Sequence, residues 1–157
     1  MSRLELIATA TFGLEAVVKR EIENLGFKIL KSEDAKITFM GDERALVKAN
    51  LWLRSADRIL IKLGEFETDT FEALFQQTRA LPWEEWIPED AKFTVTGTSV
   101  KSKLHSVPDC QAIVKKAIVE KLKEFYCRQW FEETGPEYVI KVGLLKDRAT
   151  ITLDTSG

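Results

Sequence analysis

The sequence predicts an α+β fold made of two consecutive units, and two observations support this prediction. Residues 1–67 contain segments with strand or helix patterning in the order β-α-β-β-α-β, and residues 68–157 contain a second set of helices and strands. Of the 157 residues, 45% are apolar and 31% are charged, so the chain can fill a core and keep a polar surface. We therefore expect residues 1–67 and 68–157 to form two small domains.

The first unit opens with an expected strand from Leu4 to Thr9 and continues into a helix. The apolar residues of this helix recur at helical spacing, namely Leu14, Val17, Val18, Ile22 and Leu25. Gly26 suits the left-handed backbone that ends many helices. The stretches KILKS and KITFMG then predict a hairpin across Glu33-Asp34-Ala35.

Asp42 is the predicted N-cap of a second helix, ERALVKANLWLRSA. One face of this helix carries Ala45, Ala49, Trp52 and Ala56. The stretch RILIKLGEF predicts the last strand of the unit. The resulting order of elements, β-α-β-β-α-β, is that of the split motif called ferredoxin-like.

The second unit is predicted to begin with a helix, TFEALFQQTRAL, capped by either Asp69 or Thr70. Its residues in helical register are Phe71, Leu74, Phe75, Thr78 and Leu81. The segment PWEEWIPED interrupts the regular structure, and AKFTVTGTSV alternates with the period of a strand. The stretches YVIKVGLL and ATITLDT predict a hairpin that turns at Lys146-Asp147-Arg148.

A long helix is predicted between these strands, after a loop that contains two lysines. Ser106 and Asp109 fit the S-x-x-D capping pattern, and Pro108 falls in the first turn, where its missing N–H costs nothing. One face of the helix carries Val114, Ile118, Leu122 and Phe125, and the opposite face carries Lys116, Glu120 and Lys123. Lys115 flanks the apolar face, so its stem can lie along the surface and hold its ammonium group beside the loop.

Positive charge is concentrated around this helix, although the chain has a net charge of −2. Between Lys92 and Phe131 there are eight basic and three acidic residues, a local charge of +5, whereas Pro82 to Asp90 contains four acids. Screening limits electrostatic attraction to about 8–10 Å at cellular salt, so a polyanion responds to the local charge. We expect several of the basic groups to converge near Lys101-Ser102-Lys103.

The residue types needed for catalysis or metal binding are scarce. His105 is the only histidine, and the two cysteines, Cys110 and Cys127, do not form a CxxC pair, so no histidine-based metal cluster is expected. A nucleophilic pair of Cys110 and His105 is conceivable, but a small cysteine buried in a helix is far commoner. No glycine-rich phosphate loop occurs. We expect that this chain alone is not an enzyme and holds no metal.

The chain also lacks sequence signals for a membrane or for export. No apolar run approaches the ~20 residues needed to cross a bilayer, and no signal peptide is evident. We therefore expect a cytoplasmic protein whose thiols are reduced.

The basic stretch permits two interpretations. Its lysines can be an ordinary solvated surface, or they can bind phosphates, because the loop leads into a helix N-terminus with free N–H groups and a favourable dipole. Two further alternatives stay open. The aromatic residues Trp83, Trp86 and Trp130 are either stacking surfaces for bases or core residues. The basic residues Arg54 and Arg58 either extend the basic face or pair internally with Asp57.

Several separated motifs together resemble one family. The stretches ATATFGLEAVVKREIENLG, ANLWLRSADRIL, TGTSVKSKLHSVPDCQAIVKKAIVEKL and LDTSG are similar to the N-terminal half of bacterial THUMP-domain RNA methyltransferases. This family is often described as N6-adenine-specific DNA methylases and is similar to the enzyme that makes N2-methylguanine in 23S rRNA. The resemblance implies a ferredoxin-like domain followed by a THUMP domain. It also makes one set of residues the candidate RNA contacts: Lys101, Ser102, Lys103, His105, Gln111, Lys115 and Lys116.

In that family a methyltransferase domain follows, with a glycine-rich S-adenosylmethionine loop and an (N/D)PPY-type motif. This sequence contains neither motif. The resemblance therefore implies a substrate-recognition module that positions structured RNA, rRNA rather than tRNA, for an S-adenosylmethionine-dependent guanine-N2 methyltransferase domain absent from this chain. The chain itself would then bind no cofactor. The alternative is an interdomain or protein–protein scaffold with little RNA contact, which the tryptophans of PWEEWIPED suggest.

Overall fold

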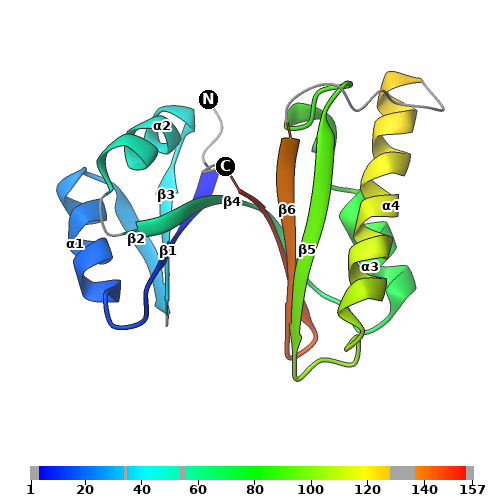
Figure 1. Ribbon diagram of the computed structural model, residues 1–157, viewed down its shortest axis with the longest axis horizontal. Helices are drawn as coiled ribbons and strands as arrows, with labels where there is room; N and C mark the ends of the chain where they lie inside the picture. The colour runs from blue at the N-terminus through cyan, green and yellow to red at the C-terminus, as the bar shows by residue number, and fades with distance from the viewer. Residues whose placement is uncertain (1–3, 34, 54–55, 128–136, 155–157) are drawn as a thin grey trace. The chain divides into compact units, whose positions relative to one another are not determined.

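The computed structural model describes residues 4–33, 35–53, 56–127 and 137–154 of the chain (Figure 1). Its contacts divide the chain into two compact units. Residues up to Lys62, together with Asp154, belong to the first unit, and Leu63–Leu153 form the second. Each unit combines a sheet with helices, so the predicted α+β class is confirmed. The domain boundary between residues 67 and 68 stays a prediction.

The first unit has the predicted order of strands and helices. It consists of β1 (Leu4–Ala10), α1 (Glu15–Asn24), β2 (Lys28–Glu33), β3 (Lys36–Gly41), α2 (Glu43–Trp52) and the first part of β4 (Ala56–Glu67). The strands lie in the order β2-β3-β1-β4, and the neighbouring strands are antiparallel. Both helices cover the same face of this sheet (Figure 1). This is the ferredoxin-like arrangement.

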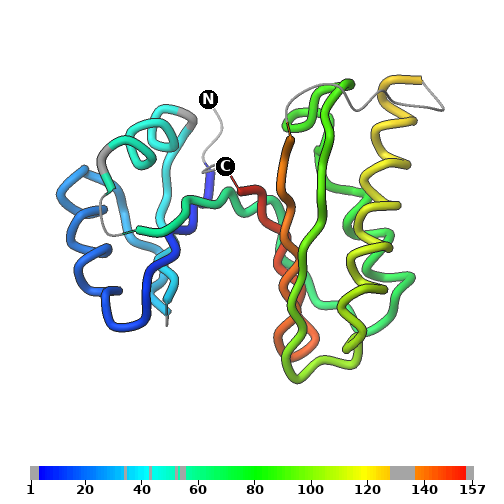
Figure 2. Tube along the Cα trace, in the orientation of Figure 1, coloured from blue at the N-terminus to red at the C-terminus, as the bar shows by residue number. Residues whose placement is uncertain are grey.

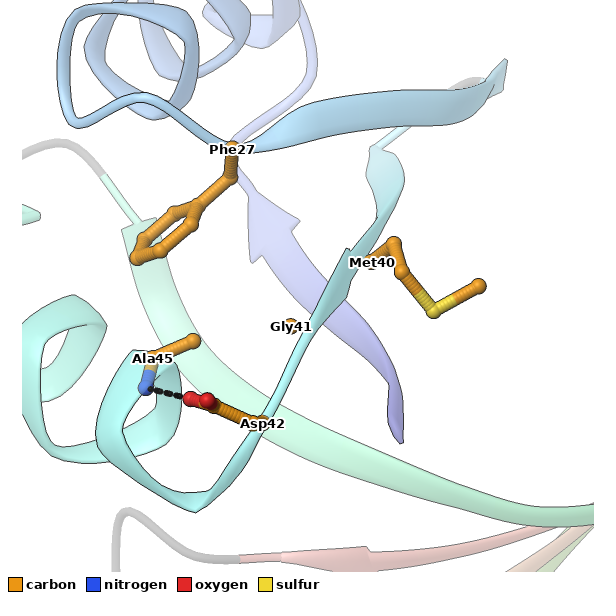
Figure 3. Close-up of a pocket in the computed structure, with 5 residues that line it drawn as sticks. All are labelled: Phe27, Met40, Gly41, Asp42 and Ala45. Carbon is orange, nitrogen blue, oxygen red and sulfur yellow. Dashed lines mark hydrogen bonds between the residues drawn. The ribbon is translucent and has the colours of Figure 1, made fainter. Parts of the chain in front are cut away.

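Local signals explain where α2 begins and ends. The Asp42 carboxylate accepts a hydrogen bond from the Ala45 N–H at 2.9 Å, as predicted for an N-cap (Figure 3). A Cβ on Gly41 would lie 2.5 Å from the Ala45 Cβ, so only glycine allows this close approach. Asp42, Gly41 and Ala45 line an open hollow of about 250 Å³ together with Phe27 and Met40.

The predicted apolar face of α2 is shorter than expected. Ala56 was expected on its apolar face but lies in β4, because the extended backbone of Leu53 ends the helix. The side chain of Trp52, expected on the same face, lies outside the described residues.

The apolar pattern of α1 is only partly used for packing. Val18 and Ile22 are fully buried, whereas Leu14 and Val17 are 42% and 43% exposed, contrary to the predicted inward face. The reason is that the sheet of this small unit covers only the stripe through Val18 and Ile22. Gly26, at φ +89°, follows the helix in the predicted left-handed conformation.

The loop before α1 is held by a carboxylate. Glu15 accepts hydrogen bonds from the Gly13 N–H at 2.6 Å and from the Ala35 N–H at 2.9 Å. These bonds, led by that from Ala35, lower the pKa of Glu15 below its ordinary value. The carboxylate thus ties the start of α1 to the turn between β2 and β3.

The second unit packs two helices on one face of its sheet (Figure 1). Beyond the second part of β4 it contains α3 (Phe71–Arg79), the short helix η1 (Trp83–Glu85), β5 (Lys92–Val100), α4 (Val107–Tyr126), β6 (Glu137–Leu145) and β7 (Arg148–Asp154). The strand order is β4-β7-β6-β5, and β5 runs parallel to β6 at the edge. Thr70 rather than Asp69 caps α3, because its hydroxyl accepts from the Ala73 N–H at 3.1 Å.

The core of the second unit contains most of the side chains that were predicted to be buried. Trp83 is fully buried, and its Nε1–H donates to the Thr78 carbonyl at 2.7 Å. In α4 the residues Val114, Ile118 and Leu122 are buried as predicted. Phe125 is 57% exposed, so its prediction as a core residue is wrong. In this last turn it is the neighbouring Tyr126 that packs inward, since its hydroxyl donates to the Ile87 carbonyl at 3.2 Å.

The predicted capping by Ser106 is also wrong, since its side chain makes no capping hydrogen bond. A serine cap bonds the second or third N–H of a helix. Pro108, the second residue of α4, has none, and Ser106, with a ψ of 99°, does not bond that of Asp109, the third residue. Among the described residues, no helix is long and apolar enough to span a membrane.

Candidate nucleic-acid interface

Three connections of the second unit meet at one end of its sheet (Figure 2). They are the link between β4 and α3, the loop between β5 and α4, and the two-residue turn between β6 and β7. The Thr68 N–H donates to the Asp147 carbonyl at 2.8 Å, and the Lys146 N–H donates to the Val100 carbonyl at 3.1 Å. We call residues 68–70, 101–106 and 146–147 together the three-loop end.

Asp147 is bonded to both of the other connections. Its carboxylate accepts the Lys103 N–H at 2.7 Å, and its own N–H donates to the Ser102 hydroxyl at 3.0 Å. The Ser102 hydroxyl in turn donates to the Val100 carbonyl at 3.1 Å. These bonds, together with that from Thr68, give the three-loop end a defined backbone.

The three-loop end presents several cations to solvent. The exposed lysines here are Lys101, Lys103 and Lys146; His105 is exposed in the same loop, and the exposed Arg148 directly follows the turn. The Lys103 ammonium lies 3.5 Å from the Asp69 carboxylate, and Arg148 pairs with Glu65. Such exposed pairs contribute about 0–1 kcal/mol, so the cations can exchange these partners for phosphates.

The backbone at this end adopts an uncommon conformation. Lys101, Lys146 and Asp147 have φ values of 50°, 50° and 64°. The left-handed region costs a non-glycine residue roughly 1–2 kcal/mol. Lys146 and Asp147 adopt it because they form a two-residue hairpin turn, and the favoured form of this turn needs positive φ at both positions. Strained backbone is typical of functional sites, so the three-loop end is a candidate site on this ground too.

The start of α4 lies in the same region. Leu104 is buried and anchors the loop, because its carbonyl accepts the Ser99 hydroxyl at 2.7 Å. Ser106 leaves the first-turn N–H groups of α4 without a side-chain cap. A helix N-terminus with free N–H groups favours anions through hydrogen bonding and through its dipole.

The structure gives no support to a Cys110–His105 nucleophile. The Cys110 side chain is 1% exposed, while His105 lies on the surface. Burial, with a smaller effect from Asp109, raises the pKa of the Cys110 thiol. A neutral thiol enclosed in the core is a poor nucleophile.

The remaining candidate contacts lie farther along α4 and separate from one another. Gln111 is half-buried, and its Cγ would be 3.4 Å from a Cβ on Gly97. The Lys115 ammonium lies 5.5 Å from the centre of the Phe93 ring on β5. The Lys116 ammonium lies instead over Phe75 of α3, at 5.9 Å. The two lysines therefore flank α4 on different sides, about 12 Å along the helix from its start.

The structure places Lys101, Ser102, Lys103 and His105 in one loop. The expectation that the Lys115 ammonium lies beside this loop is wrong, because the ammonium lies over the Phe93 ring on β5. Sequence reasoning missed Lys146 and Asp147 as members of the same cluster. Their signal was present, since a hairpin turn was predicted at these residues, but nothing local indicates which loop that turn meets.

The structure places two of the three tryptophans and one of the two arginines whose roles the sequence left open. Trp83 is a core residue, Trp86 is half-buried, and Trp130 lies outside the described residues. Arg58 pairs with Asp154 rather than with Asp57, and Arg54 lies outside the described residues.

Comparison with known families assigns both units. Residues 5–60 match the family model of the RlmL ferredoxin-like domain, and residues 68–154 match that of the THUMP domain. The chain belongs to the THUMP domain family. Its THUMP domain holds α3, β5, α4, β6 and β7, and therefore the whole of the three-loop end. The ferredoxin-like and THUMP domains implied by the sequence resemblance are confirmed.

Similar proteins are known in sequence and in structure. A protein of Bacillus subtilis (strain 168), named "Putative RNA methyltransferase YpsC", is 54% identical over all of this chain, which covers 41% of that protein. The crystal structure of a "predicted N6-adenine-specific DNA methylase" from Listeria monocytogenes str. 4b F2365 has 52% identity and a TM-score of 0.95, covering 100% of this chain and 41% of that one.

A second crystal structure, that of SMU.472, "a putative methyltransferase complexed with SAH", has 46% identity and a TM-score of 0.94. The match covers 100% of this chain and 42% of that chain. The chain therefore spans about two fifths of the length of these relatives.

Proposed function

We propose that this chain is the RNA-binding module of an S-adenosylmethionine-dependent RNA methyltransferase. The THUMP family match and relatives named as methyltransferases support this proposal. One relative was solved with SAH, the product that S-adenosylmethionine leaves after methyl transfer, so the methyl donor belongs to the parent enzyme in this proposal. The module holds structured RNA so that a catalytic domain elsewhere in the parent protein reaches its target base.

The observation that carries the proposal is the group of cations at the three-loop end. Lys101 and Lys103 belong to a hydrogen-bonded loop beside the start of α4, and His105 is exposed in the same loop as a hydrogen-bonding group. A defined loop loses little conformational freedom when it binds, and its charges sit beside helix N–H groups that also favour phosphate. Contacts of this type give affinity and register without reading sequence.

The proposed contact residues divide into two groups. Lys101, Lys103 and His105 form the first, with Ser102 bonded within the loop. The second group extends along α4 as Gln111, Lys115 and Lys116. Because Lys115 and Lys116 flank the helix on different sides, a single RNA backbone that follows one side engages one of them more strongly.

The finer part of the proposal concerns the RNA itself. The sequence resemblance favours rRNA as the substrate and the N2 atom of guanine as the methylated position. Titration of the chain against purified rRNA and tRNA tests the first point, and we expect tighter binding to rRNA. Mapping of methylated nucleotides in cells that lack the parent gene tests the second, and an unmethylated N2-guanine site is the expected result.

The decisive experiment reverses two charges at the three-loop end. The variant Lys101→Glu/Lys103→Glu should bind RNA at least several-fold more weakly than the wild type. Binding by the wild type should also decline with added salt, because phosphate contacts release counterions. The matched control is Lys92→Glu/Lys121→Glu, with the same change in charge at residues toward the other ends of β5 and α4. Salt-insensitive binding, or equal losses in both variants, would refute the proposal.

A scaffold function is the second candidate, and exposed apolar residues of the first unit favour it. Phe12, Val47 and Leu51 are 77%, 60% and 65% exposed. Contiguous exposed apolar side chains are typical of surfaces that bind another protein segment, and Val47 and Leu51 lie one turn apart on α2. If this function dominates, Phe12→Ser should weaken association with the rest of the parent enzyme and leave RNA affinity unchanged. Gel filtration of the chain with the remaining part of the parent measures this.

A further inference from the structure

A negative charge at the centre of the proposed RNA site needs an explanation. The Asp147 carboxylate would repel phosphates, and an asparagine would tolerate the same left-handed backbone. The structure gives the carboxylate a specific role, since it accepts the Lys103 N–H at 2.7 Å. The Asp147 N–H donates to the Ser102 hydroxyl and its carbonyl accepts the Thr68 N–H, so Asp147 bonds both of the other connections of the three-loop end.

We infer that Asp147 is a positioning residue of the RNA site and that Lys146, beside it, is a further phosphate contact. This inference rests on the proposed RNA-binding function. Asp147 acts through the loop: with its side chain bonded, the segment from Lys101 to His105 keeps one backbone conformation. Lys146 is exposed at the tip of the adjoining turn, and its N–H is bonded to the Val100 carbonyl directly before Lys101. The cations of two connections therefore lie on one hydrogen-bonded frame.

The test compares two substitutions of Asp147 that both remove the charge, of which one keeps an acceptor for the Lys103 N–H and the other does not. Asp147→Gly adopts φ +64° without strain but removes the carboxylate, whereas Asp147→Asn keeps an acceptor for the Lys103 N–H and removes the charge. RNA affinity should fall by about three- to tenfold in the glycine variant. It should be unchanged or higher in the asparagine variant, because one repulsive charge is gone.

A measurement without RNA checks the positioning directly. Amide hydrogen exchange at Lys103, followed by NMR, should be at least about tenfold faster in Asp147→Gly than in the wild type, because the acceptor is missing. Asp147→Asn should retain most of the protection. Thermal unfolding of both variants identifies any general loss of stability. A uniform rise in exchange over the whole second unit would contradict a local role for Asp147.

Lys146 is tested by two variants, one that removes the charge and one that keeps it. Lys146→Gly relieves the left-handed backbone and removes the charge, so the protein should be as stable as the wild type or more stable. Its plot of log affinity against log salt should nevertheless be shallower by about 0.7–0.9, the loss of one phosphate contact. Lys146→Arg should keep the wild-type slope. Equal slopes in all three proteins would exclude Lys146 as a contact.

The outcomes separate this inference from the proposed function. If reversal of Lys101 and Lys103 weakens binding while Asp147→Gly binds as the wild type does, the module binds RNA and Asp147 does not position its loop. If the wild type shows no salt-dependent RNA binding, the proposed function fails and the inference fails with it. If Asp147→Gly and Asp147→Asn weaken binding equally, the charge rather than the acceptor matters, and the positioning role is overturned.

Discussion

Replacement of Trp83 by alanine should destabilise the second unit severely. In the scaffold interpretation this tryptophan forms an interface, and its loss would weaken assembly but not folding. The structure shows Trp83 fully buried, with its Nε1–H bonded to the Thr78 carbonyl at 2.7 Å. Its removal should therefore unfold the unit before any interface is affected.

The magnitude follows from the burial. A fully buried tryptophan removes about 150–250 Å² from water, which at 25 cal/mol per Å² is roughly 4–6 kcal/mol. Substitutions of this kind cost about 3–5 kcal/mol in measured cases, because the surroundings relax into part of the cavity. For a unit that spans Leu63–Leu153, a loss of about 4 kcal/mol lowers the Tm by roughly 15–30 °C.

Urea unfolding followed by far-ultraviolet circular dichroism measures this loss, with separate transitions assigned to the two units where they appear. Trp83→Phe keeps most of the ring but loses the Nε1–H donor, so about 1–2 kcal/mol is expected. Trp86→Ala is the matched control, because Trp86 lies in the same segment but is only half-buried. It should cost clearly less than Trp83→Ala.

A loss below about 1 kcal/mol in Trp83→Ala would contradict the burial of Trp83, because the removal of a buried tryptophan costs about 3–5 kcal/mol. Equal losses in Trp83→Ala and Trp86→Ala would also contradict it, since Trp83 is the fully buried one and is bonded to the Thr78 carbonyl.

Three further predictions concern groups outside the RNA site. Glu15→Gln should make the free energy of unfolding less dependent on pH between about pH 6 and pH 2, as measured by urea unfolding. The Ala35 N–H lowers the pKa of Glu15 from 4.5, so the carboxylate stabilises the fold above pH 4.5. This contribution is lost in the wild type as the pH falls through the folded-state pKa. Identical profiles would contradict this. Native protein should react with a thiol reagent at Cys127, which is exposed, and not at Cys110, which is buried and has a raised pKa. Both cysteines should react in urea. Prompt labelling of Cys110 in the folded protein would show that this residue is not buried. Asp42→Ala should cost about 1 kcal/mol through loss of the α2 N-cap, and a cost near zero in thermal unfolding would show that the cap is dispensable.

Local patterns were sufficient for most of the secondary structure. Asp42 and Thr70 cap the helices at which they were predicted, and the hairpin turns at Lys146 and Asp147. Each of these depends on residues within four positions of one another, so the sequence contains all the necessary information. The Ser106 cap is an exception, because the Asp109 N–H that the pattern offers is present and the Ser106 side chain does not bond it.

Periodicity did not reveal how much of each apolar face is covered. Leu14, Val17 and Phe125 satisfy the helical pattern but are exposed, since burial depends on the extent of the neighbouring sheet and helices. Periodicity also did not show which tryptophans are buried. Trp83 and Trp86 stand three residues apart in one segment, and only the packing decides that Trp83 is the buried one.

The sequence by itself determined the two α+β units, their elements and the placement of Lys101, Lys103 and His105 at the junction of a strand and a helix, because each of these depends on near neighbours in the chain. Only the tertiary structure decided that Asp147, 44 positions from Lys103, bonds this loop, and that Lys115 and Lys116 diverge around α4. The physical reason is the parallel pairing of β5 with β6, which sets Val100 opposite Leu145 and so carries the turn at Lys146 to the loop that follows Val100.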